Sequence, residues 1–389
     1  MAATRPGHVD EVDVVRIVTF AAVIAVHAIA FTQRPSNQVA AGAMMLLQFG
    51  RELFFALMGF VLVYSAERRY PGARAFWRRR FLFVAVPYLA WTLIYWFDAV
   101  LRGQHQRLVS DLVTGNAEYH LYFLLVTMQL YLVFPLVLRF VRRTAPRAWT
   151  VLGAVAVVNL AWLAALHSVH SPPGWAGWVW GHAYELLPTY SMYVLAGCYA
   201  ALHLGRVREV VRSKADVLVA AAVGAAGLAL VAYVAQLSTR APRDAADVLQ
   251  PAMALSCLAA VLLLFVGGSR WAASERRAGA GDASNAMVQE ASDISFGVYL
   301  AHPLVLQLLL DAGLGNTGQR LPAPLATVLA FVGAAVGAAA LTLAARRTPF
   351  SLALTGRARR PGVTVLTDLS ASPNVPLRVV PVPTATIGS

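Results

Sequence analysis

Charged residues and cysteines are both scarce in this chain of 389 residues, and each shortage excludes a class of protein. Charged residues make up only 13% of the chain, against roughly 25% in soluble globular domains. Because 58% of the residues are hydrophobic and the mean hydropathy is +0.61, a water-soluble fold is excluded. The two cysteines, Cys198 and Cys257, lie in apolar segments, which excludes a disulfide framework and a cysteine-rich metal site.

Sequence motifs for bound nucleotides and catalytic metals are missing as well. The chain contains no glycine-rich nucleotide loop, no HExxH and no GxSxG. We therefore expect neither ATP nor a metal ion, and no permanently bound cofactor. The net charge of +13 is not gathered in a soluble basic domain with interleaved aromatic residues, so nucleic acid is not expected as a partner.

What the sequence does contain is a series of apolar stretches of about 20 residues, the length that crosses a bilayer as a helix. They predict an all-α integral membrane protein, a bundle of about ten transmembrane helices. Glu185 and Pro188 interrupt the start of the sixth. The predicted spans are Val14–Phe31, Met44–Ser65, Phe81–Val100, Tyr119–Leu138, Trp149–Leu166, Ala183–Leu202, Val217–Gln236, Val248–Val266, Ile294–Leu310 and Ala323–Ala345.

Arginine is concentrated in every second loop, which predicts the orientation of the chain in the membrane. The clearest clusters follow the second and fourth spans: Arg68, Arg69, Arg74, Arg78, Arg79 and Arg80, then Arg139, Arg142, Arg143 and Arg147. Positive loops stay in the cytoplasm, so we expect both termini there, in a multi-pass protein of the cell membrane. An even number of spans predicts the same. Much of the net charge is then explained by topology and by contact with anionic lipid.

Two regions are predicted along the chain. Residues 1–347 form the transmembrane domain. Residues 348–389 are rich in proline, threonine and valine, and we expect a mostly disordered cytoplasmic tail there.

Arg16 and His27 are the leading candidates for chemistry. They stand eleven positions apart in the first span, with no ionisable residue between them. Eleven helical steps are close to three turns, so both side chains project from one face, about 16 Å apart along the axis. Ionisable groups at membrane depth usually face a protein interior or a wet cavity. An arginine suits phosphate and a histidine suits proton transfer, whereas the alternatives are ordinary loop charge and a buried histidine bonded to a carbonyl.

Glu52, Ser65 and Arg68 of the second span are further candidates. Glu52 is expected to orient His27 or an acceptor hydroxyl, unless it only pairs with the adjacent Arg51. Ser65 and Arg68, three residues apart on one helix face, fit a phosphate-rich group at the cytoplasmic mouth. The positive-inside rule explains Arg68 equally well.

Histidines in two later spans are candidates for the acceptor side. His120 opens the fourth span, and Ser295, Tyr299 and His302 form a stripe at i, i+4 and i+7 in the ninth. We interpret His120 and Tyr299 as substrate-binding and His302 as catalytic. Interfacial anchoring and helix packing are the respective alternatives.

In their order along the chain, these segments resemble the acyltransferase-3 family of integral membrane acyltransferases. The Arg16 and His27 spacing is similar to the family's R-x10-H motif, and Ser65-Ala-Glu-Arg68 is similar to its SxxR motif. The resemblance extends from about residue 10 to 310. In chain order, the other matching segments are Glu52-Leu-Phe-Phe-Ala-Leu-Met-Gly59-Phe, Arg79-Arg80-Phe, Pro87-Tyr88, His120-Leu-Tyr-Phe-Leu with Tyr131 and Pro135, and Ser295-Phe-Gly-Val-Tyr299-Leu-Ala-His302-Pro. Met58 stands where the family usually has serine before Gly59.

The resemblance implies transfer of an acyl group, often acetyl, from cytoplasmic acyl-CoA to a hydroxyl of a carbohydrate or glycosylated small molecule. It places Arg16 and His27 at essential motif positions and Arg68 at the SxxR arginine. Two other classes of function are open: a transporter or flippase for a glycan or acylated metabolite, and a membrane sensor or scaffold. Transporters often carry internal repeats, which are not visible here.

Overall fold

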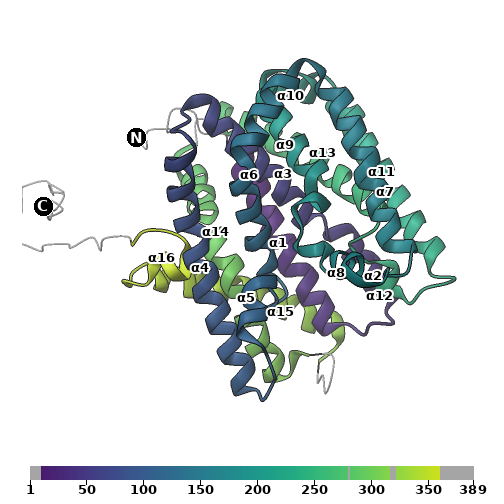
Figure 1. Cartoon of the computed structure of the whole chain (residues 1–389), viewed down its shortest axis with the longest axis vertical. Coiled ribbons are helices and arrows are strands. Elements are labelled where there is room, and N and C mark those ends of the chain that lie inside the picture. The colour runs from purple at the N-terminus through teal and green to yellow at the C-terminus, as the bar shows by residue number, and fades with distance from the viewer. Residues whose placement is uncertain (1–9, 279–280, 316–320, 360–389) are drawn as a thin grey trace, which may run out of the picture. The chain divides into compact units, whose positions relative to one another are not determined.

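The computed structural model describes residues 10–278, 281–315 and 321–359, and within them every regular element is helical (Figure 1). The all-α prediction is confirmed for this part of the chain. The long helices are α1 (Asp10–Thr32), α3 (Gly50–Arg68), α4 (Ala73–Leu101), α6 (Tyr122–Thr144), α7 (Ala148–Ser168), α11 (Ala215–Gln236), α13 (Ala252–Ala278), α14 (Gly281–Leu309) and α15 (Ala323–Ala345).

Shorter elements join or cap these helices. They are α2 (Gln38–Leu47), α5 (Leu108–Thr114), α8 (Gly174–Gly181), α9 (Ser191–Leu202), α10 (Leu204–Ser213), α12 (Pro242–Ala245), α16 (Ser351–Thr355), the 3-10 turns η1 (Ala145–Arg147), η2 (Ala183–Glu185) and η3 (Leu187–Tyr190), and the π turn η4 (Leu310–Leu314).

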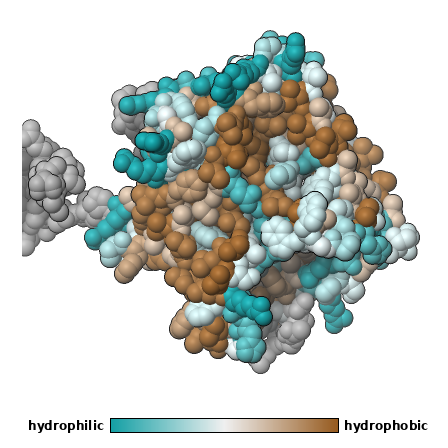
Figure 2. Space-filling view, viewed as in Figure 1, coloured by the Kyte–Doolittle hydropathy of each residue, from teal (hydrophilic) through white to brown (hydrophobic). Residues whose placement is uncertain are grey.

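The described helices include eight segments that are long and apolar enough to cross a membrane. The chain is therefore a multi-pass membrane protein. Figure 2 shows hydrophobic side chains across the middle of the visible face and hydrophilic ones toward its edges. Large apolar side chains of α4 and α11 are exposed, as expected for a surface that contacts lipid tails; examples are Leu93, Phe97, Val223 and Val231.

The count of eight is lower than the predicted ten for two reasons. First, α6, η1 and α7 form one segment of 47 residues, Tyr122–Ser168. At about 1.5 Å per residue it reaches about 70 Å, enough for two crossings of a hydrocarbon core about 30 Å thick. Second, the predicted span Ala183–Leu202 is broken. Leu186 is extended, the 3-10 turn η3 with Pro188 near its start follows, and the α-helix after it, α9, has only 12 residues.

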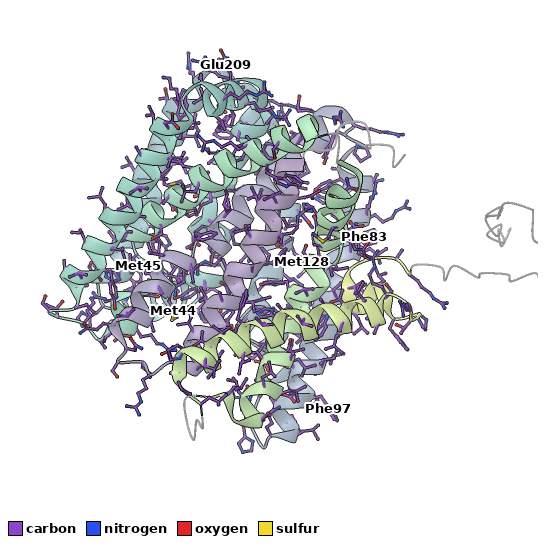
Figure 3. All side chains as sticks on the ribbon, turned by 180° about the vertical axis from the view of Figure 1, so that it is seen from behind. Met44, Met45, Phe83, Phe97, Met128 and Glu209 are labelled. Carbon is purple, nitrogen blue, oxygen red and sulfur yellow. The ribbon has the colours of Figure 1, made fainter. Side chains whose placement is uncertain are left out.

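The helix α1 occupies the middle of the described bundle and contacts α2, α3, α13, α14 and α15 (Figure 1). Around it, α3 packs on α9 and α14 packs on α15. The short helix α2 packs against α11, where the fully buried Met45 meets Tyr233 and Met253 in one apolar cluster (Figure 3). Glu209 of α10 and Phe97 of α4 lie at opposite ends of the bundle in this view. The central position of α1 is what places His27 among several helices.

Prolines inside α4, α6 and α14 each remove one backbone hydrogen bond, because proline has no N–H to donate to the carbonyl four residues earlier. In α6, Pro135 leaves the Tyr131 carbonyl without this helical partner. The indole Nε1 of Trp77 donates to that carbonyl at 2.8 Å and so ties α4 to α6. A polar side chain thus finds an acceptor inside an apolar bundle.

The helical part of the chain extends past the predicted domain boundary at residue 347. The short helix α16 contacts α4, α14 and α15, and its Ser351 and Thr355 are buried. The indole Nε1 of Trp91 donates to the Leu354 carbonyl at 3.0 Å. The segment up to Arg359 therefore packs on the bundle, while residues 360–389 of the predicted tail lie outside the described residues.

Candidate active site

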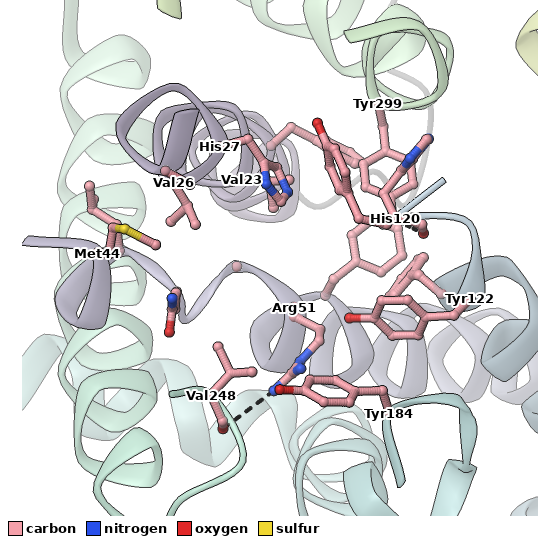
Figure 4. Close-up of a pocket in the computed structure, with 18 of the residues that line it drawn as sticks. Val23, Val26, His27, Met44, Arg51, His120, Tyr122, Tyr184, Val248 and Tyr299 are labelled. Carbon is pink, nitrogen blue, oxygen red and sulfur yellow. Dashed lines mark hydrogen bonds between the residues drawn. The ribbon is translucent and has the colours of Figure 1, made fainter. Parts of the chain in front are cut away.

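A cavity of about 430 Å³ lies beside α1, within the usual range of ligand pockets (Figure 4). Its wall combines α1, the α2–α3 junction, the segment before α6, η2 and α14. His27 lies on one side, and Arg51 and Tyr184 lie across from it (Figure 4). Several residues far apart in the sequence therefore face one space.

The cavity follows one stripe of α1. Phe20, Val23, His27 and Ala30 line it, and they continue the helical series that Arg16 begins at i, i+4, i+7, i+11 and i+14. Arg16 itself does not line the cavity and lies one turn before Phe20. The structure thus confirms that Arg16 and His27 share a helix face.

Arg16 is held in a polar network at the start of the bundle. Its Nη1 donates to Ser292 Oγ at 2.8 Å and lies 3.4 Å from Asp13 Oδ1. The Ser292 hydroxyl donates to the same Asp13 oxygen at 2.7 Å. The network joins α1 to α14. Within it, the Arg16 side chain is 27% exposed.

His27 and two histidines predicted from other spans, His120 and His302, come together in one cluster, in which His27 lies beside Tyr119 and His302. The His27 ring centroid is 4.1 Å from that of Tyr119 and 5.7 Å from that of His302. The His120 and His302 centroids are 5.4 Å apart, and Tyr299 lies 5.1 Å from His120. The Tyr299 hydroxyl donates to the His120 carbonyl at 2.8 Å and so fixes the segment before α6 on α14.

The orientation of His302 follows from the proline after it. Pro303 cannot donate to the Tyr299 carbonyl, four residues earlier in α14. The His302 Nδ1 lies 2.7 Å from that carbonyl and donates to it, which assigns the proton to Nδ1. The other nitrogen, Nε2, is buried and has no hydrogen-bond partner among the described residues. It therefore keeps its lone pair within the histidine cluster.

Arg51 and Glu52 form an ion pair beside the cavity. Arg51 Nε donates to Glu52 Oε1 at 3.0 Å, and Nη2 bonds the same oxygen and reaches the Val248 carbonyl at 3.5 Å (Figure 4). The guanidinium also lies over the rings of Tyr184 and Tyr190, at 5.4 and 5.2 Å. Glu52 is 2% exposed and does not line the cavity, so the structure gives it the predicted local pair and does not bring it to His27.

A sequence profile of the acyltransferase-3 family, described as an acyltransferase domain, matches residues 9–343. The chain belongs to the acyltransferase-3 family. No curated protein and no solved structure matches the chain. Family membership makes the chain a membrane acyltransferase, which needs an acyl donor and an acceptor. It favours this function over the two alternatives, a transporter and a scaffold.

The acyltransferase carries Ser65 and Arg68 on the last turns of α3, where both side chains are exposed. The Arg68 guanidinium lies 5.2 Å from the centre of the Tyr64 ring. Neither residue lines the cavity. The structure therefore does not join these two residues to His27, and a role in donor binding stays a prediction.

Several residues of the acyltransferase cavity were missed in the sequence. Arg51 and Glu185 line it. From the sequence, Arg51 is considered only as a partner of Glu52, and Glu185 only as an interruption of the sixth span. Tyr119 also lines the cavity, with its ring 4.1 Å from that of His27. The residue before it in the loop is Glu118, and burial raises the pKa of this carboxyl to about 7. The one signal that could have found Arg51 and Glu185 is that both are ionisable residues within predicted spans.

Proposed function

We propose that this acyltransferase transfers an acyl group, most simply acetyl, from cytoplasmic acyl-CoA to a hydroxyl of a carbohydrate or glycosylated small molecule. It works in the cell membrane with both termini in the cytoplasm. The observation that carries the proposal is the place of His27: its imidazole lies on the wall of a ligand-sized cavity, on the helix stripe that begins at Arg16.

The donor binds at the Arg16 end of this stripe. Arg16 is partly exposed, and its planar fork of N–H donors suits the phosphates of CoA. Ser65 and Arg68 on the neighbouring helix α3 add polar and cationic groups to the same mouth. The pantetheine arm then runs along Phe20 and Val23, which line the cavity, and brings the thioester to His27. CoA is a substrate that leaves after each turnover.

His27 acts as the general base. Its imidazole takes the proton of the acceptor hydroxyl while the oxygen attacks the thioester carbonyl. The carbon–sulfur bond then breaks, the imidazolium returns the proton to the CoA sulfur, and an ester and free CoA leave. A well-placed general base contributes about 10²–10⁴ in rate. His302 acts through its neighbour, because its ring lies 5.7 Å from that of His27 and its tautomer is set by the Tyr299 carbonyl.

His120 and Tyr299 shape the acceptor side. Both line the cavity, and the bond from the Tyr299 hydroxyl to the His120 carbonyl holds them together. Phe54 and Phe123, which also line the cavity, add apolar rings beside them. These residues orient the acceptor hydroxyl toward His27.

The test is acyl-CoA turnover by the purified protein in detergent, read as release of free CoA thiol. We expect His27→Ala to lower kcat by about 10²–10⁴. His105→Ala, in the exposed loop between α4 and α5, should keep wild-type activity. Full activity of His27→Ala would overturn the role of His27. A wild-type protein that moves a glycan across vesicle membranes but releases no CoA would favour the transporter instead.

A further inference from the structure

We infer that the cavity wall opposite His27 selects the acceptor: it binds an uncharged, hydroxyl-rich ring and rejects acceptors that carry a carboxylate or a phosphate. This inference rests on the proposed transfer to a carbohydrate and adds a charge preference to it. Arg51 and Tyr184 lie across from His27, with Tyr122 beside them (Figure 4). Glu185 follows Tyr184 in η2 and is bonded by Asn116, and both residues also line the cavity.

Arg51 offers a hydrogen-bond donor without a free positive charge. Its Nε and Nη2 are engaged by Glu52, and its plane is fixed over the Tyr184 and Tyr190 rings. Among the described residues its Nη1 has no partner, although Arg51 lines the cavity. A guanidinium neutralised by a carboxylate still donates to a hydroxyl oxygen, but its attraction for an anion is largely cancelled.

Glu185 is the charge on this wall that has no counter-ion. The residue is 8% exposed and lines the cavity. Asn116 Nδ2 donates to its Oε1 at 3.1 Å, and within the described part of the chain no cation pairs with it. Its Oε2 is buried without a hydrogen-bond partner among the same residues. An ionised carboxylate only accepts hydrogen bonds, so the part of Glu185 that lines the cavity offers no donor and presents a negative charge to a ligand.

The backbone around Glu185 is held firmly. Gln129 Nε2 donates to the Glu185 carbonyl at 2.6 Å, and Gln129 Oε1 accepts from the Leu187 amide at 3.0 Å. One side chain of α6 therefore clamps η2 to η3. A carboxylate on a clamped turn is preorganised, which reduces the ordering cost of binding.

This wall offers both hydrogen-bond donors and hydrogen-bond acceptors, which suits a sugar ring. Each hydroxyl of a sugar is both a donor and an acceptor. The Tyr122 hydroxyl points toward the space between His27 and Arg51 (Figure 4). Glu185 leaves the wall with one uncompensated negative charge, so a uronic acid or a sugar phosphate meets like-charge repulsion.

The experiment compares matched acceptors with the purified full-length protein and acetyl-CoA. The probes are methyl glucoside, galactoside and mannoside, each paired with its methyl uronoside, and mass spectrometry reads the acetylated product. We expect wild-type kcat/KM to be at least about tenfold higher for the neutral member of a pair. Glu185→Gln should remove most of this preference and raise KM for the neutral sugar with little change in kcat. Glu209→Gln, on the distant helix α10, should behave as wild type.

Equal use of both members of each pair by the wild-type protein overturns the inference, as does a preference that Glu185→Gln leaves unchanged. CoA release without acetylation of any sugar also overturns it, while the acyltransferase mechanism stands. No CoA release with any acceptor contradicts the proposed function itself. Where Glu185→Gln does not fold, Asn116→Ala, which removes only the exposed support of the carboxylate, should raise KM for the neutral sugars.

Discussion

Single residues decide where polar groups find partners inside this apolar bundle. Pro303 has no N–H for the Tyr299 carbonyl, and His302 Nδ1 donates to that carbonyl instead. In the same way, Pro135 has no N–H for the Tyr131 carbonyl, and Trp77 Nε1 donates to it. In both cases an unmade backbone bond becomes the anchor of a side chain. In α14 this anchor sets the tautomer of a histidine next to His27, so a sequence pair, His-Pro, has a direct chemical consequence.

Pro303→Ala tests this anchor. The new amide N–H competes with His302 Nδ1 for the Tyr299 carbonyl, so we expect kcat to fall. A drop of about tenfold is expected by analogy with the loss of a hydrogen-bond partner that orients a metal-ligating histidine. KM for acyl-CoA should stay unchanged, because in the proposed mechanism the CoA phosphates are held at the Arg16 end of α1, away from His302. The measurement is steady-state CoA release. Pro135→Ala makes the same change in α6, away from His27, and should leave kcat as it is. Unchanged kcat in both variants would mean that the orientation of His302 does not matter.

At the scale of elements, α9, the helical remainder of the sixth predicted span, packs very closely on α3. A Cβ on Gly59 would overlap the Val194 carbonyl oxygen, and one on Gly197 would overlap the Ala56 carbonyl oxygen. The two backbones approach this closely only because both residues are glycine. Met58, where the family usually has serine, is partly buried and packs against the main core, so this substitution is accommodated beside Gly59.

Gly59→Ala should destabilise the protein. The added methyl must displace the α9 backbone, and overpacking of this kind costs about 1–3 kcal/mol. Thermal unfolding in detergent should show a lower Tm, and activity should fall in proportion to the unfolded fraction. Gly227→Ala in α11 is the control, because nothing lies within 4 Å of the Cβ it would add. Since alanine favours a helix over glycine by about 1 kcal/mol, the control should keep or raise Tm. A Tm of Gly59→Ala equal to wild type would contradict the packing argument.

At the scale of the whole molecule, the distribution of arginine predicts how the bundle sits in the bilayer. One cluster of positive charge lies on the helix α10 and its C-cap: Arg206, Arg208, Arg212 and Lys214. Glu209, also on α10, lies at the opposite end of the bundle from Phe97 (Figure 3). The positive-inside rule places the α10 end in the cytoplasm. The Arg16 end of α1 would then face cytoplasmic CoA, and His27 would lie deeper in the bilayer.

Cysteine labelling in intact cells tests this orientation. The two native cysteines, Cys198 and Cys257, are buried, so they give little background. With a membrane-impermeant maleimide, we expect Gln104→Cys, exposed after α4, to react in intact cells. Ser213→Cys, exposed at the end of α10, should react only after the cells are opened. The reverse pattern would show that the predicted orientation is wrong and that Arg16 lies on the side of the membrane away from cytoplasmic acyl-CoA.

The sequence by itself determined what depends on local pattern. Runs of apolar residues predicted the membrane helices, and eleven steps between Arg16 and His27 predicted a shared helix face, which the structure confirms. The order of short motifs predicted the acyltransferase-3 family, which the profile match confirms. These features follow from helix geometry and hydropathy, which need no knowledge of distant residues.

Only the tertiary structure decided which distant residues meet. It gathered His27, His120 and His302 around Tyr119, and it brought Arg51 and Glu185 to one cavity while leaving Ser65 and Arg68 outside it. It also reduced the sixth predicted span to α9 and packed α16 on the bundle. The physical reason is that these outcomes depend on which helix faces pack together. A single apolar helix carries little information about its neighbours, because lipid and protein interior attract its apolar side chains almost equally.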